Sequence, residues 1–539
     1  MKILFTFLLS LLASFAIQAI EEKPNFIIII ADDLNDAVSG IGGHPQTKTP
    51  NIERIKNSGV QFINAACNVP LCGPSRASMW SGIAPHTSGY FGYKQQVNRW
   101  DNNEILNGTI TLFQHMVKNG YTNFSTGKIH HNGHEKREIF NNLDGSSGFG
   151  HEGNFGPIPW DGKEETKQLG VLPPWMPEYT RKNGSWGDGF GPIEDLKQYG
   201  SEFRWKMFYN SSGWEYREGS NRDLMPDEIC AQDAVQFLEQ KHEQPFFLTV
   251  GFTKPHSPWY APKKYFESFP LESLKLVNIK KNDSEDCSKI LVQDQDISQP
   301  WGWQKYDKIT KSGGDLQLLK WTQAYLACVA FMDDQLGKIL DSLENSPYKN
   351  NTYVIFTSDH GYHMGEKDYL FKFSPWEESA RIPLLVQGPN IPMNQTVETP
   401  VSLLDIYPTI TDLAGISSQP NKLTTKLPLD GYSMRPLLEN PMKEAWEGKD
   451  FTITAIASKE PVDLNKSAPN QEQHYSVRTK RHRYIYCRNG EEELYDHKTD
   501  PNEWTNIAKN IEQQKILISM RSRLRTIGIQ LKKEIPSEL

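Results

Sequence analysis

The sequence predicts an α/β fold in which a central, mostly parallel β-sheet lies between layers of helices. Short apolar runs rich in β-branched residues recur along the chain, and amphipathic stretches long enough for helices lie between them. Strands that are apolar on both faces are typical of a sheet covered by helices on both sides. After about residue 440 the runs become shorter and alternate, which predicts a smaller C-terminal antiparallel sheet with a helix.

The first residues are typical of a secretory signal peptide. Lys2 precedes an apolar run over residues 3–17, and a small residue stands at Ala19. The run is shorter than the roughly 20 residues of a membrane-spanning helix, so we expect cleavage rather than anchoring. We predict that residues 1–20 are removed, that the protein is secreted or periplasmic, and that it has no stable membrane anchor.

Residues 21–440 are predicted to form the main α/β domain, because a 539-residue chain is too long for a single hydrophobic core. Buried strands are expected at Phe26–Ile30, Phe246–Val250, Val354–Phe356 and Pro383–Val386. Helices are expected at Ile110–Lys118, Ile229–Gln240 and Leu318–Leu343. The stretch Gly145–Gly219 is rich in Gly, Trp, Pro and Tyr and has little periodicity, so we interpret it as long loops that shape a cleft.

Residues 441–539 are predicted to form a small α+β subdomain. Its expected strands are Phe451–Ile456, His474–Arg478, Arg483–Cys487 and Glu493–Tyr495. A terminal helix is expected over Ile511–Ile527.

Composition narrows the class of protein. The formal net charge of −8 disfavours a nucleic-acid partner, because phosphate binding needs clustered Lys and Arg. The cysteines are sparse and irregularly spaced, so they indicate neither a disulfide framework nor a zinc ribbon, although a single disulfide of unknown pairing would be compatible with them. They are Cys67, Cys72, Cys230, Cys287, Cys328 and Cys487.

Polar residues follow three of the predicted strands. These clusters are Asp32 with Asp33, Lys254 with His256, and Asp359 with His360. The carboxyl ends of parallel strands form the ligand-binding edge of an α/β sheet, so we expect the clusters to converge. Adjacent carboxylates repel unless a cation or hydrogen bonds compensate them, and with Asp359 they would suit Ca²⁺ or Mg²⁺. The alternative is an Asp pair that caps the next turn.

The segment Cys72-Gly73-Pro74-Ser75-Arg76 carries the sharpest signal. Pro74 and Ser75 suit the start of a helix, whose first amides attract an anion, and Arg76 adds positive charge. The segment resembles the signature Cys-x-Pro-Ser-Arg of the type I sulfatases, in which the cysteine is oxidised to formylglycine (3-oxoalanine). The alternative interpretation is a buried loop cysteine.

Further segments resemble that family in the expected order, from about residue 24 to about residue 508. They are Asn25 to Asp33, Gly120-Tyr121 through Gly127-Lys128-Ile129-His130-His131, Lys254-Pro255-His256, Ser358-Asp359-His360-Gly361 with Lys372, and Glu493-Leu494-Tyr495-Asp496 with Asp500-Pro501. The Lys-Pro-His triplet is similar to that of the iduronate-2-sulfatase-like branch. The resemblance implies an alkaline phosphatase-like fold and membership of that superfamily.

The resemblance also implies a ligand set and catalytic roles. A single Ca²⁺ would be held by Asp32, Asp33, modified Cys72, Asp359 and His360, although many sulfatases carry Asn in place of this histidine. The implied catalytic residues are Cys72, Arg76, Lys128, His131, His256 and Lys372. Substrate would contact Lys128, Lys254, His256 and Lys372, and we add His474 from the C-terminal stretch. Because branches differ in where the histidine after Lys128 stands, His130 remains the alternative to His131.

In the implied mechanism, the hydrated formylglycine at position 72 attacks sulfur. His256, with Lys372, protonates or stabilises the leaving oxygen, and a proton passes to His131 as sulfate is released. The family's formylglycine-generating enzyme would act on the unfolded chain. That enzyme is therefore an expected partner.

The expected function is hydrolysis of sulfate esters on a carbohydrate, such as a glycosaminoglycan, an algal glycan or an oligosaccharide derived from one. Aromatic faces stack on sugar rings, although the tryptophans of the central stretch can equally serve to pack its loops. They are Trp160, Trp175, Trp186, Trp205 and Trp214. The alternatives are a phosphomonoester, phosphodiester or phosphonate hydrolase, and a non-catalytic carbohydrate-binding homologue.

Overall fold

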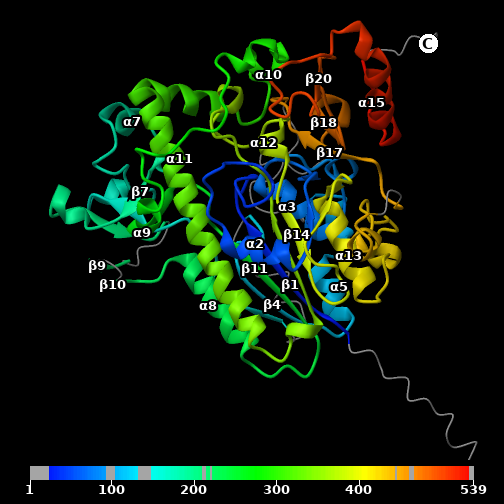
Figure 1. The fold of residues 1–539 in the computed structure, drawn as a ribbon, viewed down its shortest axis with the longest axis horizontal. Coiled ribbons are helices and arrows are strands. Elements are labelled where there is room, and N and C mark those ends of the chain that lie inside the picture. Colours follow the sequence, from blue (N-terminus) through cyan, green and yellow to red (C-terminus); the bar gives the residue numbers. More distant parts are fainter. Residues whose placement is uncertain are drawn as a thin grey trace, which may run out of the picture.

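The structure is a computed structural model that describes most of the chain. The described residues are 23–92, 103–131, 147–208, 214–218, 221–442, 446–460 and 467–532. The predicted signal peptide lies outside them. Figure 1 shows a large sheet between helices, with a small sheet and helix α15 (Gln514–Thr526) at one end.

The large sheet has the strand order β15-β2-β14-β13-β1-β11-β4-β5. Its strands are β1 (Asn25–Ala31), β2 (Gly59–Phe62), β4 (Thr122–Gly127), β5 (Ser147–Phe149), β11 (Phe246–Phe252), β13 (Thr352–Ser358), β14 (Leu384–Gln387) and β15 (Gln395–Val397). Strand β14 runs antiparallel to both of its neighbours, and the remaining neighbours pair in parallel. The prediction of a mostly parallel α/β sheet is confirmed.

Strand β1 explains why the sheet needs helices on both faces. All of its residues are buried, and neighbours along a strand point to opposite sides. Ile27 and Ile29 belong to one hydrophobic core, and Phe26, Ile28 and Ile30 belong to the other. The continuous apolar run in the sequence therefore corresponds to a strand with a hydrophobic core on each face.

Two helical layers provide that cover (Figure 1). The first contains α2 (Pro50–Asn57), α8 (Pro226–Leu238) and α11 (Trp301–Glu344). The second contains α3 (Cys72–Ser81), α5 (Leu112–Lys118), α13 (Ile406–Leu413) and α14 (Arg435–Glu439). Helix α11 begins well before the predicted start at Leu318. The sequence pattern does not reveal its first part, because Gly313 and Gly314 adopt non-helical angles that kink the helix and interrupt the apolar period.

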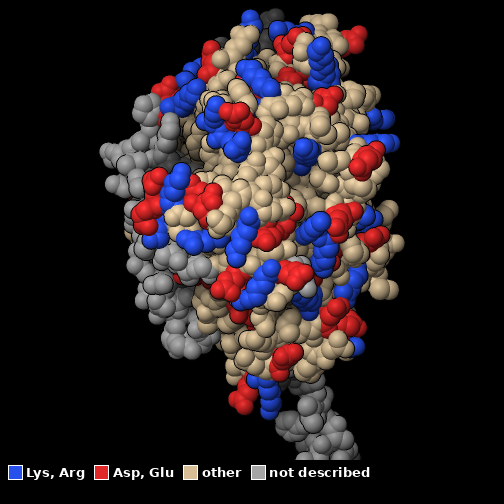
Figure 2. Space-filling view, turned by 90° about the vertical axis from the view of Figure 1, so that its left-hand side faces the viewer, with Lys and Arg blue, Asp and Glu red and all other residues tan. Residues whose placement is uncertain are grey.

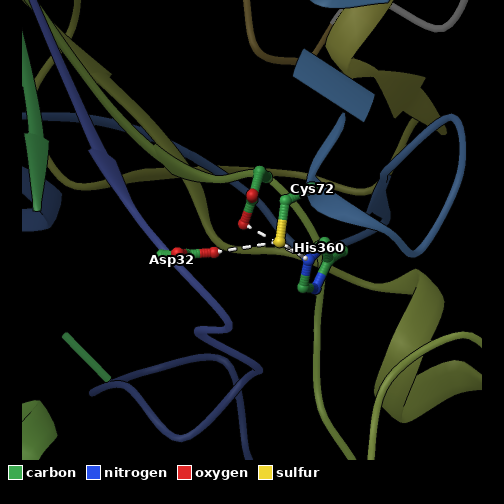
Figure 3. A group of neighbouring side chains, drawn as sticks. Asp32, Cys72 and His360 are labelled. Atoms are coloured by element: carbon green, nitrogen blue, oxygen red, sulfur yellow. Dashed lines mark hydrogen bonds and ion pairs between the residues drawn. The ribbon is translucent and has the colours of Figure 1, made fainter. Parts of the chain in front are cut away.

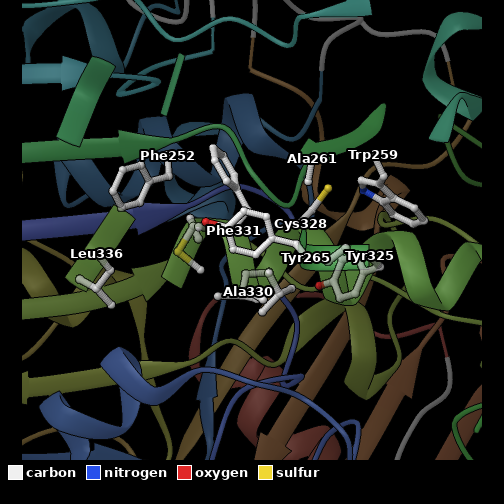
Figure 4. Close-up of a cluster of buried hydrophobic side chains, with 14 of the residues drawn as sticks. Phe252, Trp259, Ala261, Tyr265, Tyr325, Cys328, Ala330, Phe331 and Leu336 are labelled. Carbon is white, nitrogen blue, oxygen red and sulfur yellow. The ribbon is translucent and has the colours of Figure 1, made fainter. Parts of the chain in front are cut away.

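Figure 4 shows how α11 packs on the sheet and on the segment that follows β11. Phe331 lies against Tyr265 of α9 (Lys263–Glu267), with ring centroids 5.4 Å apart. Tyr325 lies edge-on to Trp259 of β12 (Trp259–Pro262), at 5.2 Å. This aromatic packing fixes the segment between β11 and β12, which carries His256.

The stretch predicted as loops contains more regular structure than expected. It forms β6 (Ile158–Trp160), α7 (Glu178–Asn183), β7 (Phe190–Ile193), β8 (Arg204–Lys206), β9 (Tyr216–Glu218) and, just beyond, β10 (Asn221–Arg222). These strands are two to four residues long and pair locally or with β12, so they leave too little periodicity to detect. Trp205 and Trp214 are buried in the core, so both serve packing.

The C-terminal sheet has the order β17-β18-β19-β20, with every neighbour antiparallel. Its strands are β17 (Phe451–Ile456), β18 (His474–Thr479), β19 (His482–Tyr486) and β20 (Glu492–Asp496). The predicted small sheet and terminal helix are confirmed. Its core also includes Tyr369, Phe373 and Trp376, so the small sheet packs on a loop that leads into the large one.

The remaining short elements connect these layers. They are β3 (Ala65–Ala66), α4 (Pro85–Ser88), α10 (Lys289–Val292), α12 (Glu377–Ala380) and β16 (Val401–Ser402). Within the described ranges, no helix combines the length and the apolar character that crossing a membrane requires. All six cysteines are described, and each is buried without a disulfide.

Candidate active site

The strand ends of the large sheet meet at one buried point. Asp32 and Asp33 follow β1, Lys128 follows β4, and Asp359 follows β13. The first residue of α3, Cys72, enters the same place from the helical layer. The structure thus brings together side chains from distant segments, as the rule for parallel strand ends predicts.

Cys72 lies at the centre of this cluster. Its Sγ is 3.0 Å from Lys372 Nζ, 3.2 Å from His360 Nε2 and 3.4 Å from Asp32 Oδ1. Figure 3 shows the sulfur between the Asp32 carboxylate and the His360 ring. Burial, together with the charge of Asp32, raises the pKa of the Cys72 thiol to about 12. The unmodified thiol is therefore protonated and a poor nucleophile.

Helix α3 presents its positive end to the cluster. Its N-cap residue Leu71 is extended and provides no side-chain cap, so the first helical amides are not satisfied by a capping side chain. Ser75 Oγ donates to the carbonyl of Asp359 at 2.6 Å, which fastens the helix to the end of β13. The N-terminus of α3 is thus fixed beside Cys72.

Arg76 connects Asp359 to the backbone that follows β4. Its Nε donates to Asp359 Oδ2 at 2.8 Å, and its Nη1 donates to the carbonyls of Lys128 and Ile129. The side chain is fully buried. Because Nε and Nη1 bind Asp359 and the backbone after β4, we interpret Arg76 as holding these two segments in register. A direct catalytic role stays a prediction.

The adjacent aspartates point to different cations. Asp32 pairs with Lys128, and Asp33 Oδ1 accepts from Lys372 Nζ at 2.6 Å. Asp33 adopts a φ of 64°, in the left-handed region, and its backbone amide donates to Asp359 Oδ1 at 3.3 Å. Although burial opposes ionisation of both, the charges of Lys128, His256 and Arg76 hold the pKa of Asp32 well below its usual range. Burial raises the pKa of Asp33.

These donors fit a hard divalent cation. Ligand atoms of Asp32, Cys72, Asp359 and His360 lie within 4.8 Å of one another, and Asp33 joins a second such group with Asp32 and Cys72. His360 Nδ1 lies 3.0 Å from the carbonyl of Gly361 and so carries the proton, which leaves the Nε2 lone pair facing the carboxylates. An oxygen-rich set with one imidazole suits Ca²⁺ and differs from a sulfur-rich zinc site.

A second group of this kind, Glu377 with His497 and Glu503, does not share that character. Arg483 pairs with both glutamates, and Arg478 Nε lies 3.2 Å from Glu377 Oε2. The acidic oxygens are therefore already matched by guanidinium groups. We interpret this group as a structural ion network.

His256 is the member of the active-site cluster closest to solvent, with a side chain that is 14% exposed. Its Nδ1 lies 2.5 Å from the carbonyl of Ser257, so the proton sits there and Nε2 faces the cluster, 3.8 Å from Asp33 Oδ2. Burial and then the charge of Lys372 lower its pKa well below the usual range. The ring is oriented to exchange a proton at Nε2.

Phe155 is a site residue that the sequence did not indicate. Its ring lies 4.5 Å from the His256 ring, and Lys128 Nζ lies 5.0 Å from its centroid. Trp186 lies 5.8 Å behind it. The high aromatic content of the stretch was the available signal, but it does not single out one ring.

Lys254 and His474 each bind a backbone carbonyl through their side chains. Lys254 Nζ donates to the carbonyl of Pro258 at 2.6 Å. His474 is fully buried on β18, with Nε2 2.6 Å from the carbonyl of Asp296. The His130 ring packs near Trp80 at 6.5 Å, whereas His131 is half-buried. Roles in substrate binding for Lys254 and His474, and in proton transfer for His131, remain predictions.

The chain is similar to known proteins over most of its length. The family profile described as Sulfatase matches residues 24–416, and the profile described as N-sulphoglucosamine sulphohydrolase, C-terminal, matches residues 365–530. A sulfatase of Formosa agariphila is 33% identical over 517 residues, which cover 94% of this chain and 87% of that protein. Iduronate 2-sulfatase of Mus musculus is 26% identical over an alignment that covers 74% of this chain and 69% of that protein.

Among solved structures, a protein in complex with its substrate D-glucosamine-2-N,6-O-disulfate has a TM-score of 0.63. The alignment covers 94% of this chain and 98% of that chain, at 21% identity. At this identity the likeness concerns the fold alone.

Proposed function

The chain belongs to the sulfatase family, and we propose that it is a secreted enzyme that hydrolyses sulfate esters of a carbohydrate by means of a formylglycine at position 72 and one bound Ca²⁺. Membership confirms the family inferred from the motifs and makes the chain a sulfuric ester hydrolase. The observation that supports the proposal most is the position of Cys72, on the positive end of α3 and between Lys372, His360 and Asp32.

Modification of Cys72 accounts for a nucleophile that the thiol cannot supply. The thiol is protonated at neutral pH, whereas an oxidised and hydrated residue 72 would offer a hydroxyl to sulfur. Cys72 has no exposed surface in the folded protein. A formylglycine-generating enzyme would therefore have to act on the unfolded chain, which makes it a partner during synthesis only.

A calcium ion would be held by Asp32, Asp33, Asp359 and His360, the donor set described above. When bound, it would supply positive charge that polarises the sulfate oxygens. It would also compensate the repulsion between the buried carboxylates. The neutral His360 ring, with Nε2 turned inward, needs no rearrangement to serve as a ligand.

Two lysines neutralise the anionic ester. Lys128 and Lys372 come from distant segments, and each pairs with one of the adjacent aspartates. An ester bound between them would receive both ammonium groups, which stabilise charge as it moves to the leaving oxygen. His256 Nε2 would deliver the proton to that oxygen, because an adjacent anion favours the protonated imidazole. The ring of Phe155 would exclude water from the neighbourhood of the His256 imidazole.

The substrate class follows from the rim of the site and from relatives. One structural neighbour holds a disulfated glucosamine, and one relative is an iduronate 2-sulfatase. Phe155 and Trp186 form a partly exposed aromatic wall next to His256, where a sugar ring would leave with the departing oxygen. A sulfated sugar fits this wall, and Trp186 is the tryptophan that we assign to substrate rather than to packing.

Secretion rests on the N-terminal sequence. Lys2, the apolar run over residues 3–17 and Ala19 have the layout of a cleaved signal peptide. N-terminal sequencing of the protein recovered from medium or periplasm tests this, and a mature form that still begins at Met1 would contradict it.

Sulfate release from a panel of defined sulfated oligosaccharides tests the proposed activity. The panel runs beside an aryl sulfate, an aryl phosphate and a phosphonate ester, with Cys72→Ala as the blank. We expect release from a sulfated sugar above the blank. Faster cleavage of phosphate or phosphonate would replace the assignment, and binding of the sugars without any cleavage would indicate a non-catalytic homologue.

The modification has its own test. Intact mass of the tryptic peptide that contains residue 72 should show loss of the thiol and gain of an aldehyde. An unmodified cysteine in active enzyme would refute the formylglycine.

A further inference from the structure

The segment that carries Lys372 is a strained loop between β13 and α12. Lys367, Asp368 and Phe373 all adopt positive φ values, of 58°, 54° and 71°. Non-glycine residues take up this conformation at an energetic cost, and they keep it only where the surroundings hold them. The loop therefore needs an external support, and Lys372 stands next to one of these residues.

The C-terminal sheet holds the loop after Lys372. Trp376 Nε1 donates to Glu493 Oε2 at 2.9 Å, and the backbone amide of Glu377 donates to Glu503 Oε2 at 3.0 Å. Arg483 Nη1 donates to the carbonyl of Pro375 at 3.3 Å. Three consecutive residues of the loop are thus bound to β19, β20 and the turn beyond them.

The same turn holds the loop before Lys372. Lys367 Nζ donates to the carbonyl of Glu503, and also lies 3.2 Å from Asp283 Oδ1. Both Lys367 and Glu503 are buried. Glu503 therefore contacts the loop on both sides of Lys372, through its backbone on one side and its carboxylate on the other.

The two supporting glutamates are themselves fixed. Glu493 accepts from Tyr495 Oη at 2.7 Å and from the backbone amide of Ser288 at 2.5 Å. Glu503 forms an ion pair with Arg483, whose Nε lies 2.6 Å from Glu503 Oε1. Because neither carboxylate can turn without losing a buried partner, each transmits its position to the loop.

We propose that Glu493 and Glu503 are positioning residues of the active site, which set Lys372 against Asp33 and residue 72 by clamping the loop from the C-terminal sheet. The effect of this clamp on catalysis rests on the proposed function, in which Lys372 neutralises the charge of the sulfate ester. Glu493 begins the segment Glu493 to Pro501, which resembles the family, and Glu503 follows shortly after it. Neither glutamate contacts a reacting group.

Hydrogen exchange of the loop tests the clamp without reference to activity. Strand β20 offers a matched control, because Glu492 is the neighbour of Glu493 and binds Arg521 of α15 through two 2.6 Å contacts. We expect faster amide exchange over residues 363–377 in Glu493→Gln and Glu503→Gln, and no change in Glu492→Gln. Exchange that stays at the wild-type rate in both loop-facing variants would overturn the clamp.

A double-mutant cycle then separates positioning from general weakening. Glu503→Gln should lower kcat by roughly 10- to 100-fold, with a smaller change in KM, because small misplacements of a catalytic group are costly. The same change should have no further effect in a Lys372→Ala background and its full effect in a Lys128→Ala background. Equal losses in both backgrounds would overturn the proposal. Wild-type protein without sulfatase activity would refute the proposed function instead, while hydrogen exchange would still decide the clamp.

Discussion

Two buried clusters of charge lie within the same fold and differ in the cations they use. Around Cys72, aspartates meet two lysines, with one arginine behind them. Beneath the C-terminal sheet, Glu377 and Glu503 meet arginines. Both clusters bring carboxylates and a histidine within reach of one ion. Proximity of ligand types therefore does not distinguish a metal site from a structural network.

The cation identity does distinguish them. Guanidinium groups bind carboxylates through a rigid fork, and here Arg483 pairs with both Glu377 and Glu503. Lysine carries a single charge on a flexible stem, so in the proposed function Lys128 and Lys372 would pass from an aspartate to the incoming anion. Figure 2 shows acidic and basic side chains interspersed over the face it presents. On that face, neither sign of charge gathers into one broad patch.

The largest effect is expected from a substitution that disrupts the cluster around Cys72 and leaves the arginine network intact. Cys72→Ala should reduce sulfate release to background while the melting temperature stays close to that of wild type, because a small buried side chain is replaced by another. Kinetic assays and a thermal melt check both halves. Activity that survives this change would remove residue 72 from the reaction.

Removal of the metal should affect the cluster around Cys72 and leave the arginine network unchanged. Dialysis against a chelator should abolish activity, and added Ca²⁺ should restore it, because the cluster around Cys72 is the one in which we propose a calcium site. Metal analysis should find calcium reduced in Asp359→Asn and unchanged in His497→Gln. Calcium lost from the second variant would show that the arginine network also binds it.

Stability should depend on the other cluster. Arg483→Met leaves two buried glutamates without their main partner, so the free energy of unfolding should fall by about 3–5 kcal/mol. Arg54→Met is the control, because its partner Asp341 is exposed and the loss should stay below about 1 kcal/mol. Urea unfolding measures both. Similar values for the two variants would mean that the network is not structural.

Acid should weaken the arginine network in a defined direction. Although burial opposes ionisation, Arg483 and His497 lower the pKa of Glu503 from 4.5 to about 2. A lowered folded-state pKa stabilises the protein above pH 4.5, and this contribution is lost as the pH falls towards 2. Urea unfolding of Glu503→Gln between these pH values should show a shallower decline than wild type. Parallel curves would assign the acid sensitivity to other groups.

The parts of the fold predicted from sequence are those with strong patterns. Strand β1 is apolar on both faces, and the polar residues after β1, β11 and β13 follow directly at the strand ends. The early half of α11 was missed because Gly313 and Gly314 break its period. The alternation around His474 predicts a strand, but it cannot say that the ring turns towards Asp296.

The position of Phe155 illustrates the remaining limit. Its contact with His256 depends on where a non-repeating stretch crosses the sheet edge, and no periodicity encodes that crossing. The role of Glu503 was hidden for a similar reason. Its partners Glu377 and Lys367 are more than 100 residues earlier in the chain.

The distance along the chain between Cys72 and its neighbours imposes an order on assembly. Lys372 follows it by 300 residues and His360 by 288, so the pocket cannot close until most of the polypeptide has been made. At typical rates of synthesis of about 5–20 residues per second, that interval lasts roughly 15–60 s. During this time the proposed modifying enzyme would have access to the cysteine, which is fully buried once the layers have packed.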